Sequence, residues 1–564
     1  MKSKIIKVLL LSQSLFIWHS CADLDLFPLS ETSTGTWFKD EQQFELSVNN
    51  LLKLGFWETD DEEWSDDYMR RQILTEVTSA TVNSDWSFLP GAWLRRYKAI
   101  GRANTILFHI EGADLPQTSK NIFSGNAYFV RAAQYSYLID HWGDVVHYTE
   151  PLDLEEAYEM GRTEKNIVLE AIYQDFDSAI SKLPVSYSGK QYATKGAALA
   201  FKARIALHHQ DWTVARDAAK ECMDLGVYEL YPDYGKLFES TTKNPKEVIF
   251  AMPASDEFGI VDKWPYRCRG ALPRTVGGMA NSYPTYELFC AYPCVDGLPI
   301  DESQLFNPRE PFENRDPRLS ETIVPFGEVH CGVVFHSHPD STKVLNVETG
   351  KYINNTSALS VDRYAPFNGL LWKKGIDEFL WRNLRSETDV IMMRYADVLL
   401  MYAEAKIELN EIDQSVLDAI NKVRARAYKV DFNQTSKYPP VITTNQAKLR
   451  KILRNERRIE FACEGLRYMD IIRWRLAEKV LNKPNYGLLP VNLLRERITS
   501  KGLWFFPEVP PIDEDWVADF GPMCEEGYYQ ILSQRQFDAP KQYLWPIPST
   551  EIKICKNMEQ NPGY

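Results

Sequence analysis

An alanine repeat in the N-terminal half constrains the fold of this chain most. Between residues 194 and 209 an alanine recurs at every third position among larger apolar residues, at Ala197, Ala200, Ala203 and Ala206. A short polar break separates this stretch from a second helical pattern at 212–225. Two antiparallel helices can approach closely where alanines form the contact. The two segments are therefore predicted to form a hairpin of the tetratricopeptide type.

Helical periodicity extends beyond this hairpin. Apolar residues at helical spacing predict further helices at 41–54, 92–110, 125–141 and 165–183. A later stretch, 393–427, begins with a segment that is apolar on nearly all sides, which is typical of a buried helix. The chain shows no strict 34-residue repeat, which excludes a simple solenoid.

Two other regions have a different character. Proline, glycine and aromatic residues become frequent after residue 232 and again after residue 476. They predict long ordered loops and small strands over a helical scaffold, and binding sites usually lie on such loops. We expect a mainly α-helical domain over 41–564. The predicted scaffold covers 41–231 and 391–475, and the predicted loop-rich regions cover 232–390 and 476–564.

The first twenty residues have the features of an export signal. Three lysines precede an apolar run at 8–18, which is of secretory length and too short to span a bilayer. Cys21 follows the small residue Ser20 and precedes an acidic segment, as in a bacterial lipobox. Several acyl chains on one N-terminal cysteine give stable membrane anchoring. We predict a lipoprotein signal peptide at 1–20, a lipid anchor at Cys21 and a tether at 21–40; ordinary cleavage beside an incidental cysteine is the alternative.

Charge and composition exclude some partners. The net charge of −14 argues against nucleic acid, which requires basic patches, and disfavours electrostatic adhesion to anionic lipid. Aromatic residues make up 13% of the chain, with 15 Trp and 29 Tyr. Such residues suit stacking against sugar rings, although many of them must fill the core.

Three glutamates are the strongest candidates for catalysis. Glu456, Glu460 and Glu464 recur at intervals of four, so a continuous helix would carry them on one face. A glycosidase needs two carboxyl groups that face each other across a sugar, roughly 5–9.5 Å apart. Several arginines surround this column, which favours a structural ion-pair network instead. We therefore predict no catalytic residue and no enzyme activity.

Two other clusters are candidates for binding a metal. Four potential ligands fall within nine residues, at His330, Cys331, His336 and His338. Structural zinc sites usually draw on a second ligand cluster, and the sequence shows none here. The acidic run at 60–67 lacks the glycine and the spacing of a calcium loop, so we expect a solvated acidic face there. We predict no metal site and no cofactor.

Short sequence blocks from residue 21 to the C-terminus match one known family in order. They lie at 21–25, 97–104, 125–132, 141–144, 194–212, 284–288, 296–297, 314–318, 394–405, 455–470, 546–548 and 560–564. In this order they resemble the SusD/RagB family of outer-membrane, nutrient-binding lipoproteins. Asn126 and Val146 depart from the glutamate and proline that are usual in the family.

This resemblance implies a fold and a partner. It implies a mainly α-helical SusD-like fold, with four tetratricopeptide-like helix pairs and an irregular ligand-binding region that contains small β elements. It also implies that the protein sits as a lid on a SusC-like, TonB-dependent transporter. Ligands of the family are usually oligo- or polysaccharides, less often peptides, and its members bind rather than catalyse.

Aromatic residues in polar, turn-rich segments are the candidate ligand contacts. Sugars present apolar C–H faces and rims of hydroxyl groups, so a site needs flat aromatic rings and polar side chains together. The predicted stacking residues are Trp86, Trp264 and Tyr266. The predicted polar contacts are Asn83, Asp85 and Arg269. The alternative is that these aromatic residues fill the core or contact the transporter.

The predicted function is glycan capture at the cell surface. A protein of this kind would bind an oligo- or polysaccharide and pass it to the transporter in the outer membrane. A peptide- or glycopeptide-binding member of the family is the first alternative. A surface glycoside hydrolase is the second, and it would require a facing pair of carboxyl groups.

Overall fold

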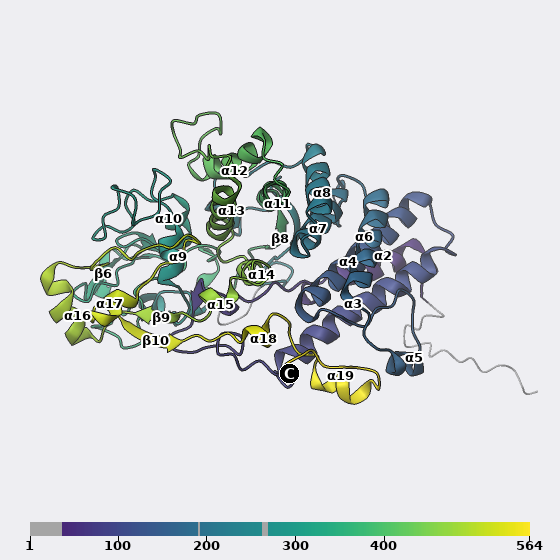
Figure 1. The fold of residues 1–564 in the computed structure, drawn as a ribbon, viewed down its shortest axis with the longest axis horizontal. Helices are drawn as coiled ribbons and strands as arrows, with labels where there is room; N and C mark the ends of the chain where they lie inside the picture. The colour runs from purple at the N-terminus through teal and green to yellow at the C-terminus, as the bar shows by residue number, and fades with distance from the viewer. Residues whose placement is uncertain (1–36, 190–191, 262–268) are drawn as a thin grey trace, which may run out of the picture.

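Helices and loops occupy different sides of the molecule. In the computed structural model, residues 37–189, 192–261 and 269–564 are described. Figure 1 shows the helices α2 to α8 gathered on one side and the short strands and long loops on the other, with α11 to α14 between them. The protein is mainly α-helical, as predicted. The predicted signal peptide, Cys21, Trp264 and Tyr266 lie outside the described residues.

The scaffold helices pack largely against their neighbours in sequence. They are α2 (Glu41–Leu51), α3 (Phe88–Ile110), α4 (Gln117–Trp142), α5 (Leu154–Glu159), α6 (Lys165–Lys182), α7 (Lys195–His208), α8 (Trp212–Asp224), α11 (Tyr395–Glu408), α12 (Gln414–Ala427) and α13 (Gln446–Glu460). Helix α3 packs on α4, α4 on α6, α7 on α8, and α11 on both α8 and α12. This arrangement is consistent with tetratricopeptide-like pairs. None of the helices in the described ranges has the length and apolarity needed to cross a membrane.

The hairpin of α7 and α8 follows from local sequence. The Thr194 side chain accepts a hydrogen bond from the Ala197 amide (3.2 Å) and caps α7. The Asp211 carboxylate caps α8 in the same way. Capping side chains satisfy amide groups that a helix leaves free at its first turn. The four alanines of the repeat are fully buried, so the helices meet across small side chains.

The loop-rich side contains short helices and small antiparallel sheets. The helices are α9 (Tyr286–Ala291), α10 (Arg318–Thr322), α14 (Arg467–Arg473), α15 (Ala477–Val480), α16 (Val491–Arg497), α17 (Gly521–Glu525), α18 (Ala539–Gln542) and α19 (Ser549–Ile554). Strand pairs are β1 (Tyr68–Met69) with β3 (Tyr283–Pro284), β2 (Val248–Met252) with β8 (Val390–Arg394), and β9 (Pro484–Gly487) with β10 (Gln530–Gln534). One four-stranded sheet has the order β4 (Val329–His330), β5 (Val333–Val334), β6 (Lys343–Asn346) and β7 (Lys351–Asn354). Strand β8 leads directly into α11 and so joins this side to the scaffold.

Glu460, the last residue of α13, lies at the centre of a buried ion-pair network. Its carboxylate pairs with Arg394 (2.7 Å), Arg318 (2.9 Å) and Arg426. Burial raises the pKa of Glu460, but these three guanidinium groups outweigh it and hold the pKa well below its ordinary value. Glu460 thus belongs to an ion-pair network, as predicted, but its partners are not the arginines next to it in sequence. Arg457 pairs with Asp397, and Arg458 and Arg467 pair with Asp66.

The column of glutamates is nevertheless shorter than predicted. Helix α13 ends at Glu460, because Phe461 leaves the helical conformation and caps it. Glu464 therefore follows the helix rather than lying on its face. It pairs with Lys374 (2.6 Å) and Arg394 (2.8 Å), so it still belongs to the buried network.

A second buried network fixes the segment after α2. The Asp66 carboxylate pairs with Arg458 (2.9 Å) and Arg467 (2.8 Å), and Asp67 pairs with Arg458 (2.6 Å). Both aspartates are at most 1% exposed. The prediction of a solvated acidic face is wrong for these two residues, because their arginine partners come from distant parts of the chain.

The C-terminal segment completes the core of the helical side. The Trp545 ring packs edge-on against Trp64 (5.2 Å) and Trp142 (5.2 Å). The indole N–H of Trp142 donates to the Pro546 carbonyl (2.9 Å), and the Asn561 amide donates to the Trp142 carbonyl (2.9 Å). Figure 1 accordingly places α18, α19 and the C-terminus beside α3.

Candidate ligand-binding groove

Two adjoining cavities lie where the loop-rich side meets the scaffold. The scaffold cavity has a volume of about 130 Å³ and lies between α4, α7 and β8. The loop cavity has a volume of about 230 Å³ and is lined mainly by residues 59–68 and 372–391. The cavities share lining residues, among them Thr59, Asp60 and Glu464. We call the two together the junction groove.

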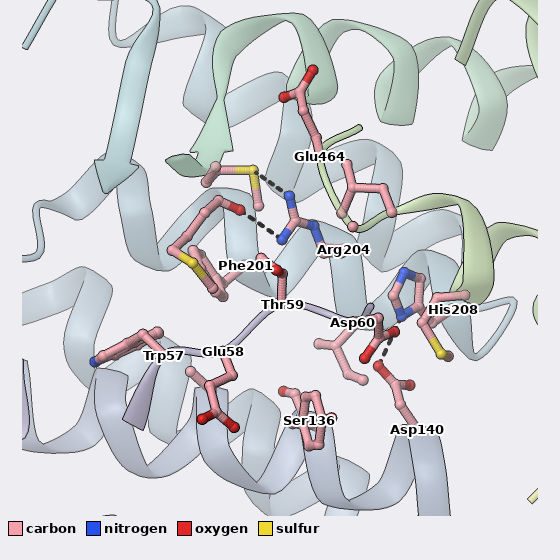
Figure 2. Close-up of a pocket in the computed structure, with 18 of the residues that line it drawn as sticks. Trp57, Glu58, Thr59, Asp60, Ser136, Asp140, Phe201, Arg204, His208 and Glu464 are labelled. Carbon is pink, nitrogen blue, oxygen red and sulfur yellow. Dashed lines mark hydrogen bonds and ion pairs between the residues drawn. The ribbon is translucent and has the colours of Figure 1, made fainter. Parts of the chain in front are cut away.

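Polar groups of the scaffold cavity mostly bind one another. Figure 2 shows the chain through Thr59 and Asp60 crossing this cavity between α4 and α7. Arg204 donates to the Asp397 carboxylate (2.6 Å) and to the Met392 carbonyl (2.9 Å). His208 lies 2.8 Å from Asp140. These groups already have hydrogen-bond partners. They therefore hold the cavity wall in place and offer few free donors or acceptors to a ligand.

Aromatic and polar side chains meet in the loop cavity. Its lining includes the rings of Tyr68, Trp372 and Trp381. Tyr68 and Trp372 stack with ring centroids 5.9 Å apart. Asp61 and Arg385, both exposed, lie in the same lining and supply a carboxylate and a guanidinium group. This combination suits a sugar, which needs flat apolar surface and polar groups together.

Three buried polar atoms of the loop cavity lack a hydrogen-bond partner. They are the Trp372 indole nitrogen, the Thr388 hydroxyl and Oε2 of Glu62. None of the three has a partner among the described residues. Buried polar groups without a partner are rare, because each costs about 1–3 kcal/mol. A hydroxyl-rich ligand can both donate to and accept from such groups.

Glu62 has an unusual protonation state in this cavity. Burial raises the pKa of Glu62 from its ordinary value of 4.5 to about 8, although a hydrogen bond from the Gly465 amide (2.6 Å) opposes the shift. The carboxyl group is therefore protonated at neutral pH and can donate a hydrogen bond. Strongly perturbed carboxyl groups in clefts are typical of functional sites.

This shift predicts a specific pH dependence of stability. Between about pH 4.5 and pH 8 the folded protein keeps the Glu62 proton, whereas the unfolded chain loses it. The free energy of unfolding should therefore fall by about 1.4 kcal/mol per pH unit through this window on account of Glu62. The amide side chain in the Glu62→Gln variant does not titrate. Its free energy of unfolding should therefore lack the contribution of Glu62 to this decrease with pH. Chemical denaturation at pH 5, 6, 7 and 8 measures the difference, and parallel profiles for the two proteins would contradict it.

The structure places three of the predicted ligand contacts away from the groove. Trp86 is 7% exposed and packs against Trp64 (5.8 Å) and Trp545 (5.6 Å). Asn83 accepts a hydrogen bond from the Asp85 amide (2.9 Å), and Asp85 accepts one from the Ser549 hydroxyl (2.5 Å). These residues form a turn that docks on the start of α19. The burial of Trp86 favours the alternative in which its ring fills the core.

Arg269, another predicted contact, belongs to a segment that leads into the groove. The Arg269 carbonyl accepts a hydrogen bond from the Met279 amide (2.8 Å). Two and three residues later, Ala271 and Leu272 line the loop cavity. Arg269 is thus close to the groove along the chain, whereas the preceding Trp264 and Tyr266 fall in the part of the chain that is not described.

Sequence reasoning missed the residues that line the loop cavity. Tyr68 lies in the segment 59–68, whereas Trp372, Trp381 and Arg385 lie in the distant segment 372–391, and no local pattern links the two. Only the acidic run gave a signal, because Asp61 and Glu62 belong to it. That run was interpreted as a solvated face, since burial cannot be recognised from charge alone.

Comparison with known proteins gives one consistent family. A model described as the SusD family matches residues 246–564, and one described as starch-binding, associating with outer membrane, matches residues 41–207. The chain is 26% identical to SusD-like protein P25 of Formosa agariphila over 404 residues, which are 70% of this chain and 72% of that protein. It is 25% identical to SusD-like protein P2 of the same organism over 87% of this chain and 83% of that protein. A SusD-like carbohydrate binding protein from Bacteroides fragilis superposes with a TM-score of 0.76 at 28% identity, covering 93% of this chain and 100% of that one.

Proposed function

This chain belongs to the SusD family, and we propose that it captures an oligo- or polysaccharide in the junction groove. The three unpartnered polar atoms beside the aromatic rings of the loop cavity carry this proposal. The similar protein from Bacteroides fragilis, described as carbohydrate binding, supports it. We assign the protein a binding role and no catalytic one, because its named relatives are SusD-like and carbohydrate-binding proteins.

The proposal includes a place and a partner in the cell. The protein would be held at the outer membrane by lipid on Cys21 and would deliver its ligand to a SusC-like, TonB-dependent transporter. The family description that mentions association with the outer membrane supports this location. A lid that holds its ligand at the groove would release it directly into the barrel beneath.

Glycan binding can be tested with a matched pair of arginines. Arg385 lines the loop cavity and pairs with Asp256 (2.9 Å), whereas Arg382 pairs with Glu348 and does not line the cavity. We expect Arg385→Ala to weaken glycan affinity by roughly tenfold, the effect of one lost hydrogen bond to a charged group. Arg382→Ala should leave the affinity unchanged. Calorimetric titration of both variants with a panel of glycans measures this.

The outcomes of the titration separate the alternatives. Equal affinities for the two arginine variants would show that the glycan does not bind in the loop cavity. If the wild-type protein binds no glycan but binds peptides, the protein is a peptide- or glycopeptide-binding member of the family. Release of reducing ends from a bound glycan would establish a hydrolase.

The anchor makes a separate prediction. Replacing Cys21 by alanine removes the thiol that would receive lipid, so Cys21→Ala protein should leave the membrane fraction and appear in the soluble fraction. It should bind glycan like the wild type, because the groove is formed by residues far along the chain. Fractionation of cells that lack the transporter, followed by immunoblotting, measures this. Retention of Cys21→Ala in the membrane fraction would refute the lipid anchor.

A further inference from the structure

The hairpin of β4 and β5 holds an imidazole between a thiol and a carboxylate. Nε2 of His330 lies 3.6 Å from Sγ of Cys331, and Nδ1 of His330 lies 2.9 Å from Oε1 of Glu378. One potential metal-ligand atom from each of the three residues lies within 4.8 Å of those of the other two. Within the described ranges, no other group of three histidine, cysteine or acidic side chains converges in this way.

The fold buries the side chains of His330 and Cys331. Strands β4 and β5 pair in the register Val329 with Val334 and His330 with Val333. The connecting residues Cys331 and Gly332 both have positive φ angles, 51° and 78°, as a two-residue hairpin turn requires. His330 and Cys331 are each 1% exposed, whereas the Glu378 side chain is 48% exposed. The cluster thus has a buried floor and one side open to solvent.

We propose that His330, Cys331 and Glu378 bind a divalent cation of the zinc class. A tetrahedral zinc ion with ordinary bond lengths to sulfur and nitrogen, about 2.3 and 2.1 Å, separates these two atoms by about 3.6 Å. The distance between Cys331 Sγ and His330 Nε2 has this value. Sulfur, nitrogen and oxygen ligands together select borderline-soft ions such as Zn²⁺ or Co²⁺.

Binding follows a balanced step. The Cys331 thiol loses its proton to solvent, and its sulfur forms a bond to the ion beside His330 Nε2. The half-exposed Glu378 turns its carboxylate from Nδ1 onto the ion, and a water molecule takes the fourth position. One thiolate and one carboxylate then balance the two positive charges, so the buried site becomes neutral.

Glu378 supplies the ligand that the sequence did not reveal. The nearby histidines do not join the site: His336 stacks on Phe326, with ring centroids 6.1 Å apart, and His338 accepts a hydrogen bond from the Asp340 amide (3.1 Å).

Burial raises the pKa of the Cys331 thiol above its ordinary value, so without an ion the thiol stays protonated. A bound cation favours the thiolate and reverses this effect.

The site also lies against the wall of the junction groove. Cys331 packs with Leu272 and Trp381, and both of these residues line the loop cavity. A bound ion would connect the hairpin to the loop that carries Glu378 and Trp381. The proposal does not depend on the nature of the ligand in the groove, and it holds even if no glycan binds there.

Cobalt titration of the full chain tests the proposal. Co²⁺ should bind the reduced protein with a stoichiometry of one and give the near-ultraviolet charge-transfer absorption of a sulfur–cobalt bond. The variant Cys331→Ser should lose this absorption. Cys222→Ser removes another buried free thiol and should keep it.

Several results would overturn the proposal. They are the absence of the absorption in the wild-type protein, its persistence in Cys331→Ser, and its loss in Cys222→Ser. If Cys331→Ser does not fold, Glu378→Gln serves instead, because Glu378 is half exposed and its replacement leaves the core intact. We expect Glu378→Gln to weaken Co²⁺ binding by at least about tenfold. An unchanged affinity in that variant also overturns the site.

Discussion

Glu460→Ala is expected to lower the free energy of unfolding by about 3–5 kcal/mol. The carboxylate is fully buried and pairs with Arg318, Arg394 and Arg426. Its removal leaves these guanidinium groups in the interior with one carboxylate fewer, and an uncompensated buried charge is costly. Denaturation with urea at neutral pH measures the effect.

A glutamate at the surface provides the control. Glu221 pairs with Lys195 (3.1 Å) and is 51% exposed. Exposed ion pairs contribute less than about 1 kcal/mol, so Glu221→Ala should unfold close to the wild type. Both substitutions replace a glutamate by alanine, so they change the net charge and the side-chain length by the same amount. Similar losses of stability in the two variants would contradict the central role of Glu460.

Trp86→Ala is expected to lower the free energy of unfolding by a similar amount, about 3–5 kcal/mol, because it leaves a cavity in the core. The ring lies 7% exposed among other aromatic residues, and edge-on aromatic pairs add to the effect of burial. Phe258 is 75% exposed, so Phe258→Ala should cost less than about 0.5 kcal/mol. Thermal and urea unfolding of both variants measure the difference.

The same variant separates the two interpretations of Trp86. Under conditions where Trp86→Ala is still folded, its glycan affinity should equal that of the wild type, because the ring lies in the core. A large loss of affinity with little loss of stability would instead establish Trp86 as a ligand contact. The prediction from sequence would then hold for a ring that moves on binding.

Helices could be predicted from the sequence where their signals were local. The predicted limits of α7 and α8 agree with the structure to within one residue, because Thr194, Asp211 and Gly226 mark helix ends. Helix α4 was predicted to begin at residue 125 and begins at Gln117. Its first turns are polar and carry no apolar stripe, so packing on neighbouring helices, rather than periodicity, determines where it starts.

The candidate site could not be predicted in the same way. Asn83, Asp85 and Trp86 have the composition of a sugar site, but one of the rings that bury Trp86 is Trp545, near the other end of the chain. Trp372 and Glu62 are candidate ligand contacts because they line the same cavity, and the sequence does not show that cavity. Family resemblance predicted the fold and the class of ligand, but it could not assign the contacts.

The buried contacts between distant segments have a consequence for biosynthesis. Asp66 and Asp67 pair with arginines beyond residue 450, and the core of the helical side includes Trp545. A chain that emerges from the ribosome N-terminus first must wait for these partners, because neither network nor core can close before they are made. These parts of the nascent chain would therefore remain open until translation is nearly complete. At the outer-membrane location that we propose, the contacts that stabilise the finished protein would also delay its folding until after export.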